Sequence, residues 1–363
     1  MNVRIESSKI VKPLYDAGGG APPAGERVPL SVFDRVTYDV YMAVIYAFRP
    51  PTPPNAALEL GLAKTLAVYR EGALFVEATV SAPLAAVMPF GPSPELLRLH
   101  PSTAAARGGR AGELVRVQLT RFACGSLVIG FTSHHRVADG QAAGNFLVAW
   151  GLASRRLPVC DRATRFPPRD PPLVQFPHRE TEYYAPKKKK NHDDDDELAT
   201  VVHDKIKVHK VHFTKEFVAG VKARASSSPS PSPSRRGYST FQSVHAAELI
   251  RRAVARADDA YFRSFVDFAS SGAVEAEGLA ATADESQAVL CPDVEVDSWL
   301  GIDFYDLDFG GGGGGPVYFT PSYLPMEGTV FLVPSLAGDG SIDAYVALFE
   351  THLDEFKKIC YTY

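Results

Sequence analysis

The sequence predicts an α/β fold in which mixed β-sheets are flanked by helices. Apolar, strand-like runs alternate along the chain with segments of helical spacing, and several runs lie close enough together to form hairpins. Hydrophobic residues make up 45% of the chain, which supplies enough apolar material for a large core. The length of 363 residues suits two domains better than one.

In the first half of the chain, each expected element follows from a local pattern. Ser31 is a possible helix cap before a β-rich stretch, and the prolines of PPTPP end that stretch because proline lacks a backbone N–H. We expect, in order, a strand within 1–13, the β-rich stretch over 31–49, a helix over 55–69 capped by Asn55, a strand over 72–80, two strands over 113–135 that turn at Cys124–Gly125, and a helix over 140–155.

The second half follows a block of opposite charges, KKKKNHDDDDE, that contains no apolar residue and is typical of a solvated linker. We expect, in order, a strand and a helix over 201–225, mainly helix over 238–271, strands over 288–315 that end in six glycines, a hairpin-like strand pair over 312–335, and a last helix over 341–359.

Composition and charge exclude several classes of function. The net charge is −4 and the basic residues are scattered, which argues against a nucleic-acid partner. No apolar segment approaches the length of a membrane span, and the N-terminus lacks the apolar block of a signal peptide. Four cysteines (Cys124, Cys160, Cys291 and Cys360) form no CxxC pair, so we expect no metal site and reduced thiols in a cytoplasmic protein.

The stretch TSHHRVADG at 132–140 places polar residues where the apolar run RFACGSLVIGF ends. His135 lies at this strand-to-helix junction, and histidine is a natural general base because it titrates near neutral pH. Asp139 follows one helical turn later, and Gly140 permits a tight turn into the next helix. The spacing permits an aspartate–histidine dyad without requiring one. By itself, the H-x-x-x-D-G pattern does not indicate catalysis. A structural histidine with its hydrogen bonds satisfied, followed by an aspartate that caps a helix, explains the pattern equally well.

A second motif, Asp308-Phe309-Gly310, precedes the glycine tract in YDLDFGGGGGGPVYF. With both motifs and their flanks in this order across almost the whole chain, the sequence resembles the plant BAHD acyltransferases. These enzymes transfer an acyl group from coenzyme A to an alcohol or an amine. Within the family, the chain resembles the agmatine hydroxycinnamoyltransferases through SSKIVKP, VIYAFRPPTPPNAALE, FVEAT, RFACGS, FVDFASSGAVEAE, EVDSWL, YDLDFG and PSYLPMEG.

The resemblance implies a chloramphenicol-acetyltransferase-like fold with two domains and an active channel between them. On this basis we expect domains over 1–186 and 201–363, joined by the charged linker at 187–200. The donor would be a hydroxycinnamoyl-CoA such as coumaroyl-CoA, the acceptor a small amine such as agmatine, and no cofactor would be bound permanently. The family also implies a monomer that contributes to phenolamide biosynthesis in plants.

Carried over by motif, the resemblance assigns a role to each candidate residue. His135 is the general base that takes a proton from the acceptor amine as its nitrogen attacks the thioester directly. In this family the aspartate of the first motif turns away from the channel, so the orienting dyad is dropped. Structural roles are implied for Asp139, Gly140, Asp308, Phe309 and Gly310.

Two acids are candidates for binding the charged end of the acceptor. The guanidinium of agmatine favours carboxylates in a bidentate arrangement. Glu295 and Asp297 stand two apart on an expected strand, so their side chains point to one face, and the resemblance puts this strand near the acceptor channel. An ordinary solvent-facing strand edge explains the same pattern.

The chain departs from the family pattern at several positions. Gly311 replaces a usual tryptophan, and Gly301 stands where many members carry an arginine. The chain is shortened within LAVYREGALFVEAT, where the family has an extra glycine-rich and arginine-containing strand region. It is also shortened within YSTFQSVHAAELIRRAVARADDAYFRSF, where the family has a long stretch with a D-x-R-x-R strand and a Y-x-G-N segment. This second missing stretch holds the arginine that pairs with the motif aspartate. We therefore expect Asp139 to lack its partner, with the cost of a buried unpaired carboxylate, and the second domain to be incomplete with exposed sheet edges.

Three other functions remain open at this point. The first is an O-acyltransferase of the same family that uses an alcohol acceptor. The second is a truncated, non-catalytic family member, because a gene-model error or a splice variant explains the shortening as readily as a compact enzyme does. The third is a protein that binds coenzyme A without transferring an acyl group.

Overall fold

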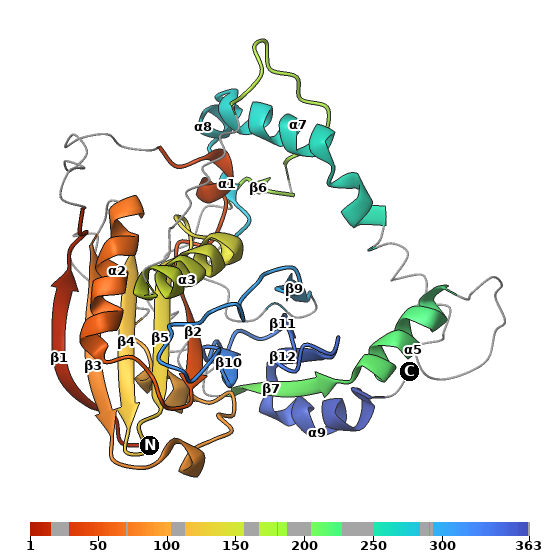
Figure 1. Ribbon diagram of the computed structural model, residues 1–363. Coiled ribbons are helices and arrows are strands. Elements are labelled where there is room, and N and C mark those ends of the chain that lie inside the picture. The colour runs from red at the N-terminus through yellow and green to blue at the C-terminus, as the bar shows by residue number, and fades with distance from the viewer. Residues whose placement is uncertain are drawn as a thin grey trace, which may run out of the picture. The chain divides into compact units, whose positions relative to one another are not determined.

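The computed structural model describes residues 1–15, 29–69, 72–102, 113–155, 167–179, 181–186, 205–226, 250, 252–283, 290 and 293–361 (Figure 1). Backbone contacts divide the chain into two compact units. The first comprises Met1–Leu30, Thr37–Thr164 and Ser298–Pro325, and the second comprises Ser31–Val36, Arg165–Asp297 and Met326–Tyr363. Ser298–Pro325 joins the first unit because its strand pairs there, although the predicted boundary places it in the second domain. The predicted linker at 187–200 lies outside the described residues.

The first unit is built on a mixed six-stranded sheet. Its order is β1-β3-β4-β5-β2-β10, and of the neighbouring pairs only β3 and β4 run parallel. The strands are β1 (Arg4–Val11), β2 (Tyr41–Phe48), β3 (Ala73–Val80), β4 (Val115–Phe122), β5 (Leu127–His134) and β10 (Tyr318–Pro321). The turn between β4 and β5 places Gly125 at a φ of 82°, a conformation that glycine adopts without strain.

Two helices, α2 (Asn55–Tyr69) and α3 (Gly140–Ser154), cover one face of this sheet (Figure 1). Their spacing explains this placement, because Leu58, Leu62 and Leu66 recur every fourth residue and are all fully buried. The indole of Trp150 in α3 donates a 2.8 Å hydrogen bond to the carbonyl of Leu58, which joins the two helices.

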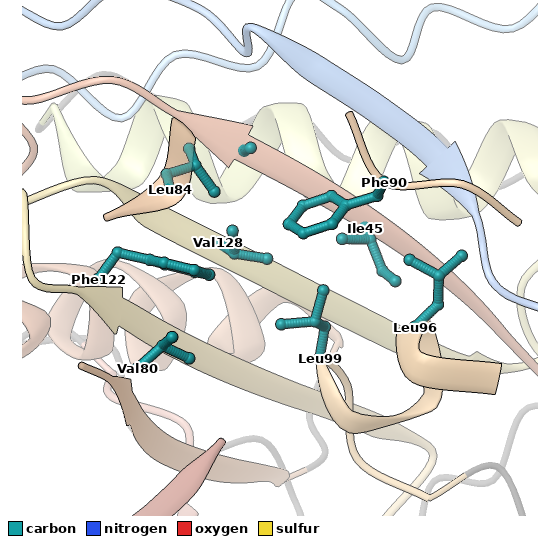
Figure 2. Close-up of a cluster of buried hydrophobic side chains, with 9 residues drawn as sticks. Ile45, Val80, Leu84, Phe90, Leu96, Leu99, Phe122 and Val128 are labelled. Atoms are coloured by element: carbon teal, nitrogen blue, oxygen red, sulfur yellow. The ribbon is translucent and has the colours of Figure 1, made fainter. Parts of the chain in front are cut away.

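An apolar cluster covers the opposite face of the sheet (Figure 2). Side chains from four strands meet the short 3-10 helices over Leu84–Ala86 and Pro94–Arg98, which lie on the connection between β3 and β4. The buried members are Ile45, Ala47, Val80, Leu84, Phe90, Leu96, Leu99, Phe122 and Val128. The parallel pair needs this long crossover, and the crossover contributes to the core.

The second unit contains a four-stranded sheet and a helical cluster. The sheet order is β7-β12-β11-β9, with β7 (Ile206–Phe213), β9 (Glu295–Ser298), β11 (Thr329–Pro334) and β12 (Ile342–Phe349). Further elements of this unit among the described residues include α1 (Val32–Arg35), α5 (Lys215–Ser226), α7 (Asp259–Ser270), α8 (Ala273–Glu277), α9 (Glu350–Ile359), β6 (Tyr183–Tyr184) and β8 (Ala280–Ala281). Val294 and Val296 at the β9 edge are 63% and 56% exposed.

Buried polar side chains of α7 fasten the proline-rich segment that precedes β6. Asp267, 1% exposed, accepts hydrogen bonds from the backbone and side chain of Arg169. Ser264 accepts from two backbone N–H groups of that segment and contacts His178 Nε2 at 2.9 Å, while His178 Nδ1 lies 3.0 Å from Glu182. These bonds satisfy the polar groups that burial would otherwise leave unpaired.

Most predicted elements are confirmed. Of the strands expected over 288–315, only β9 forms among the described residues, and 299–315 contain no strand. Residues 238–249 of the helix expected over 238–271 lie outside the described residues. Three further predictions are wrong. The hairpin expected over 312–335 does not form, because β10 pairs with β2 while β11 pairs with β12. The helix expected over 341–359 begins only at Glu350, because the preceding residues form β12, which pairs with β7 and β11. Asn55 is the first residue of α2 rather than its cap. Its side-chain amide donates a hydrogen bond to Glu77 and accepts one from Arg121. In each case pairing with distant residues overrides local preference.

Gly130 in β5 permits a close approach that any larger residue would block. A Cβ at this position would lie 2.1 Å from the carbonyl oxygen of Leu99 and 2.6 Å from the Cα of His100. We expect Gly130→Ala to lower the free energy of unfolding by about 3 kcal/mol, because backbone atoms must move to admit the methyl group. Urea unfolding monitored by circular dichroism measures this change.

Gly91→Ala is the matched control, because a Cβ at Gly91 has no atom within 4 Å. Equal unfolding midpoints for the two variants would contradict the close packing of Leu99 on β5.

Candidate active site

His135 follows directly after the last residue of β5 and is tied to the chain that leads into β2. Its backbone N–H donates a 2.8 Å hydrogen bond to the carbonyl of Val40. Its half-buried imidazole places Nδ1 3.4 Å from Thr37 Oγ1. Within the described part of the chain, Nε2 has no hydrogen-bond partner. The ring is therefore oriented through Nδ1.

The preceding histidine, His134, is held differently. Its Nε2 lies 3.3 Å from Asp39 Oδ1, and its ring packs edge-on against Tyr41. Burial lowers the pKa of His134 below its ordinary value, an effect that the Asp39 carboxylate partly offsets. Among the described residues, its Nδ1 is buried without a partner. His134 is thus held by Asp39 and Tyr41, and its unpartnered nitrogen is buried, whereas the unpartnered Nε2 of His135 is not among the buried atoms.

Three residues before β2 hold the histidine pair, and we call Thr37, Asp39 and Val40 the 37–40 clasp. Besides the contacts to both histidines, Asp39 Oδ2 forms a 2.9 Å ion pair with Arg136, whose Nε also lies 3.5 Å from the carbonyl of Thr37. No local pattern in the sequence indicates the clasp, because Thr37 precedes His135 by 98 positions and only the pairing of β2 with β5 brings them together.

Asp139 is the N-cap of α3. Its carboxylate accepts a 2.7 Å hydrogen bond from the backbone N–H of Ala142 and is exposed to solvent. The penalty expected for a buried, unpaired carboxylate therefore does not arise, because solvent and the helix N-terminus stabilise the charge. The residue starts the helix that carries the rest of the motif.

Glycines on α3 allow the segment before the second motif to pack closely against the helix. A Cβ on Gly140 would lie 2.5 Å from Ile302 Cδ1, and a Cβ on Gly151 would lie 2.8 Å from the carbonyl oxygen of Asp308. Gly140 of the first motif is therefore small because Ile302 occupies the adjacent space. The same helix begins at one motif and contacts the other.

The second motif contacts the C-terminal end of α3. Asp308 accepts a 2.8 Å hydrogen bond from the N–H of Gly310 and pairs with Arg155 at 3.2 Å. Phe309, 4% exposed, packs edge-on against Trp150 and Phe48, with ring centroids at 4.8 and 5.5 Å. These contacts support a structural role.

The glycine tract that follows requires glycine for both conformation and space. Gly310, Gly311, Gly312 and Gly314 all have positive φ. A Cβ on Gly311 would lie 2.9 Å from Pro53 Cδ, and a Cβ on Gly313 would lie 2.4 Å from the carbonyl oxygen of Arg49. The tract folds against the proline-rich turn after β2, which explains why a tryptophan does not fit at 311 here.

Glu295 and Asp297 lie on β9 in the second unit. Both are half-buried, whereas Val296 and Ser298 between and beyond them are exposed, so the two acids share one face of the strand as alternation predicts. Their role in binding an acceptor stays a prediction.

Two further findings concern the described residues only. No group of three or more His, Cys, Asp and Glu side chains among them is arranged to hold a metal ion. None of their helices combines the length and apolar character needed to cross a bilayer.

The packing of the second motif predicts unequal effects on stability. We expect Phe309→Ala to lower the free energy of unfolding by about 3–5 kcal/mol, because it empties a buried site between two aromatic rings. Asp308→Asn should cost about 1 kcal/mol or less, because its ion pair with Arg155 is a third exposed to solvent. Urea unfolding curves compare the two variants, and a larger loss for Asp308→Asn would contradict this division of roles.

Sequence comparison places the chain among plant transferases. The Transferase family model matches residues 68–260 and 238–362. Agmatine hydroxycinnamoyltransferase 1 of Oryza sativa subsp. japonica is 43% identical over 451 aligned positions, which cover 99% of each chain. Putrescine hydroxycinnamoyltransferase of the same plant is 44% identical over 458 positions and covers all of both chains. Both alignments exceed the 363 residues of this chain, so internal parts of these relatives have no counterpart here.

Solved structures show the same fold. Vinorine synthase matches with a TM-score of 0.63 at 17% identity, covering 97% of this chain and 96% of that one. TRI101 of F. sporotrichioides, complexed with coenzyme A and T-2, matches with a TM-score of 0.61 at 14% identity, covering 92% and 97%. The predicted chloramphenicol-acetyltransferase-like fold is thereby confirmed. The family model and these relatives, together with the two motifs packed around α3, show that the chain belongs to the Transferase family, the BAHD acyltransferases.

Proposed function

We propose that this acyltransferase moves a hydroxycinnamoyl group, such as coumaroyl, from coenzyme A to an amine such as agmatine. The observation that carries the proposal is the His135 imidazole, anchored through Nδ1 and its backbone N–H while Nε2 has no partner in the described chain. The names of relatives 43% and 44% identical support the donor class and the amine acceptor. We further propose that it works as a cytoplasmic monomer.

In the proposed reaction, His135 acts as general base and no acyl-enzyme forms. The amine nitrogen attacks the thioester carbonyl carbon while Nε2 takes a proton from that nitrogen. The C–S bond then breaks, an amide is left, and the imidazolium returns the proton to the departing CoA thiolate. Each catalytic cycle therefore ends with a neutral imidazole, an amide and a free thiol.

An amine acceptor must lose a proton before it can attack. Alkyl ammonium groups have a pKa near ~10, so the neutral nucleophile is scarce at pH 7. Removal of the amine from water lowers that pKa, because desolvation disfavours the charged form. Exclusion of water by the bound acyl donor would therefore assist the base in generating the nucleophile.

The charged end of the acceptor needs an anionic partner of its own. We propose that Glu295 and Asp297 supply it, because their carboxylates share one half-buried face of β9. Two carboxylates on one face match the fork of a guanidinium or the ammonium of a diamine. An acceptor without a second positive charge would gain no binding affinity from these two carboxylates.

The base assignment predicts a large loss of turnover in His135→Ala. We expect kcat with coumaroyl-CoA and agmatine to fall by about 10²–10⁴-fold, which is the usual contribution of a positioned general base. Mass-spectrometric detection of the amide measures it. His352→Ala, at an exposed histidine of α9, is the matched control and should retain wild-type turnover.

A panel of acceptors distinguishes this proposal from the other functions. Agmatine, putrescine, tryptamine and shikimate are each supplied with coumaroyl-CoA to the wild-type chain. Product with shikimate and none with the amines would establish an O-acyltransferase. A folded chain that binds coenzyme A without forming any product would be a non-catalytic family member, and both results would overturn the proposal.

The acceptor assignment predicts a selective change in KM. We expect Glu295→Gln with Asp297→Asn to raise KM for agmatine by about tenfold or more, because charge-assisted hydrogen bonds to the guanidinium are lost. KM for tryptamine, which has no second cation, should hardly change. Asp293→Asn, an exposed neighbour in the same segment, is the control. An equal rise for both amines would contradict direct recognition by the acid pair.

A further inference from the structure

We propose that Thr37 is a positioning residue that keeps His135 in the tautomer with its proton on Nδ1. This inference rests on the proposed function, and it concerns how the general base is prepared before a substrate arrives. It assigns a reaction-specific role to a residue that belongs to neither sequence motif.

The two ring nitrogens of a neutral imidazole differ in their hydrogen-bonding roles. One carries a proton and donates, and the other has a lone pair and accepts. If Nε2 is to accept the proton of the amine, Nε2 must be bare, so the ring proton must lie on Nδ1. A ring with the opposite tautomer has its lone pair facing Thr37 and cannot act as a base toward the substrate.

Thr37 is placed to stabilise the productive tautomer. Its Oγ1 lies 3.4 Å from Nδ1, and a hydroxyl oxygen has two lone pairs that can accept an Nδ1–H bond. The hydroxyl is the one hydrogen-bond partner of the His135 side chain within the described residues. A histidine that functions as a base is commonly oriented through the bond its other nitrogen makes.

The rest of the 37–40 clasp holds Thr37 where it can do this. The carbonyl of Val40 receives the backbone N–H of His135 at 2.8 Å, which sets the distance between the two segments. Asp39 binds His134 at 3.3 Å and Arg136 at 2.9 Å, on the two sides of His135. The residues on either side of His135 are thus bound to Asp39, and His135 itself is bound to Val40. The hydroxyl of Thr37 contacts the ring.

Asp139 does not orient the imidazole of His135. Asp139 is exposed and engaged with the N-terminus of α3 through Ala142. Its carboxylate has no ion-pair partner among the described residues. Orientation of the imidazole therefore depends on Thr37 rather than on the aspartate of the motif.

The test compares Thr37→Val with Thr37→Ser in the full-length chain. Valine keeps the shape of threonine but removes the acceptor, whereas serine keeps the hydroxyl. We expect Thr37→Val to lower kcat by about fivefold with little change in KM for coumaroyl-CoA, since a neutral hydrogen bond worth about 1 kcal/mol corresponds to about a fivefold change in rate. Thr37→Ser should stay within about twofold of the wild type, because it keeps the hydroxyl. Nitrogen-15 NMR of the imidazoles, assigned with His135→Gln, should show Nδ1 losing proton occupancy in Thr37→Val.

Each result has a defined consequence. Unchanged kcat and an unchanged Nδ1 signal in Thr37→Val would overturn the positioning role, and so would a loss of activity in Thr37→Ser equal to that in Thr37→Val. If Thr37→Val fails to fold, the NMR comparison of Thr37→Ser and Thr37→Ala decides the tautomer in its place. Wild-type turnover in His135→Ala would instead refute the proposed base, so the two failures are distinguishable.

Discussion

The antiparallel pairing of β2 with β5 is the constraint on which the candidate site depends. It runs in register from Tyr41 opposite His134 to Phe48 opposite Leu127, and it continues one step further as the bond from His135 to Val40. Because both strands are central in a six-stranded sheet and both faces are covered, a slip by one residue would turn every buried side chain to the wrong face. This penalty fixes the backbone position of His135, so that only rotation of its side chain can move the imidazole.

A single helix connects the two sequence motifs. Asp139 caps α3 at its start, and Arg155 at its end pairs with Asp308. Between them, small residues let the segment from Ile302 onward lie directly on the helix. The motifs thus belong to one packed assembly in the first unit, where Asp308 accepts a hydrogen bond from the backbone N–H of Gly310 and pairs with Arg155.

The shortened chain retains what the proposed base requires. The alignments with the two rice enzymes contain more positions than this chain has residues, yet the sheet, both helices and the clasp around His135 are all present in the first unit. In the second unit, β9 is at the edge of the four-stranded sheet, and Val294 and Val296 are exposed there. Exposed apolar edge strands invite association with other chains, so this edge is where aggregation would begin.

Local sequence was sufficient for the features that depend on near neighbours. The strand runs, the turn at Gly125 and the start of a helix after Asp139 are encoded within a few residues, and these elements were predicted correctly. Partners distant in the chain were not predictable in the same way. Nothing near residue 342 forbids a helix, and nothing near Thr37 indicates a histidine 98 positions later. Those outcomes depend on which strands pair and which buried groups must find hydrogen bonds, and such requirements exist only once the sheet has formed.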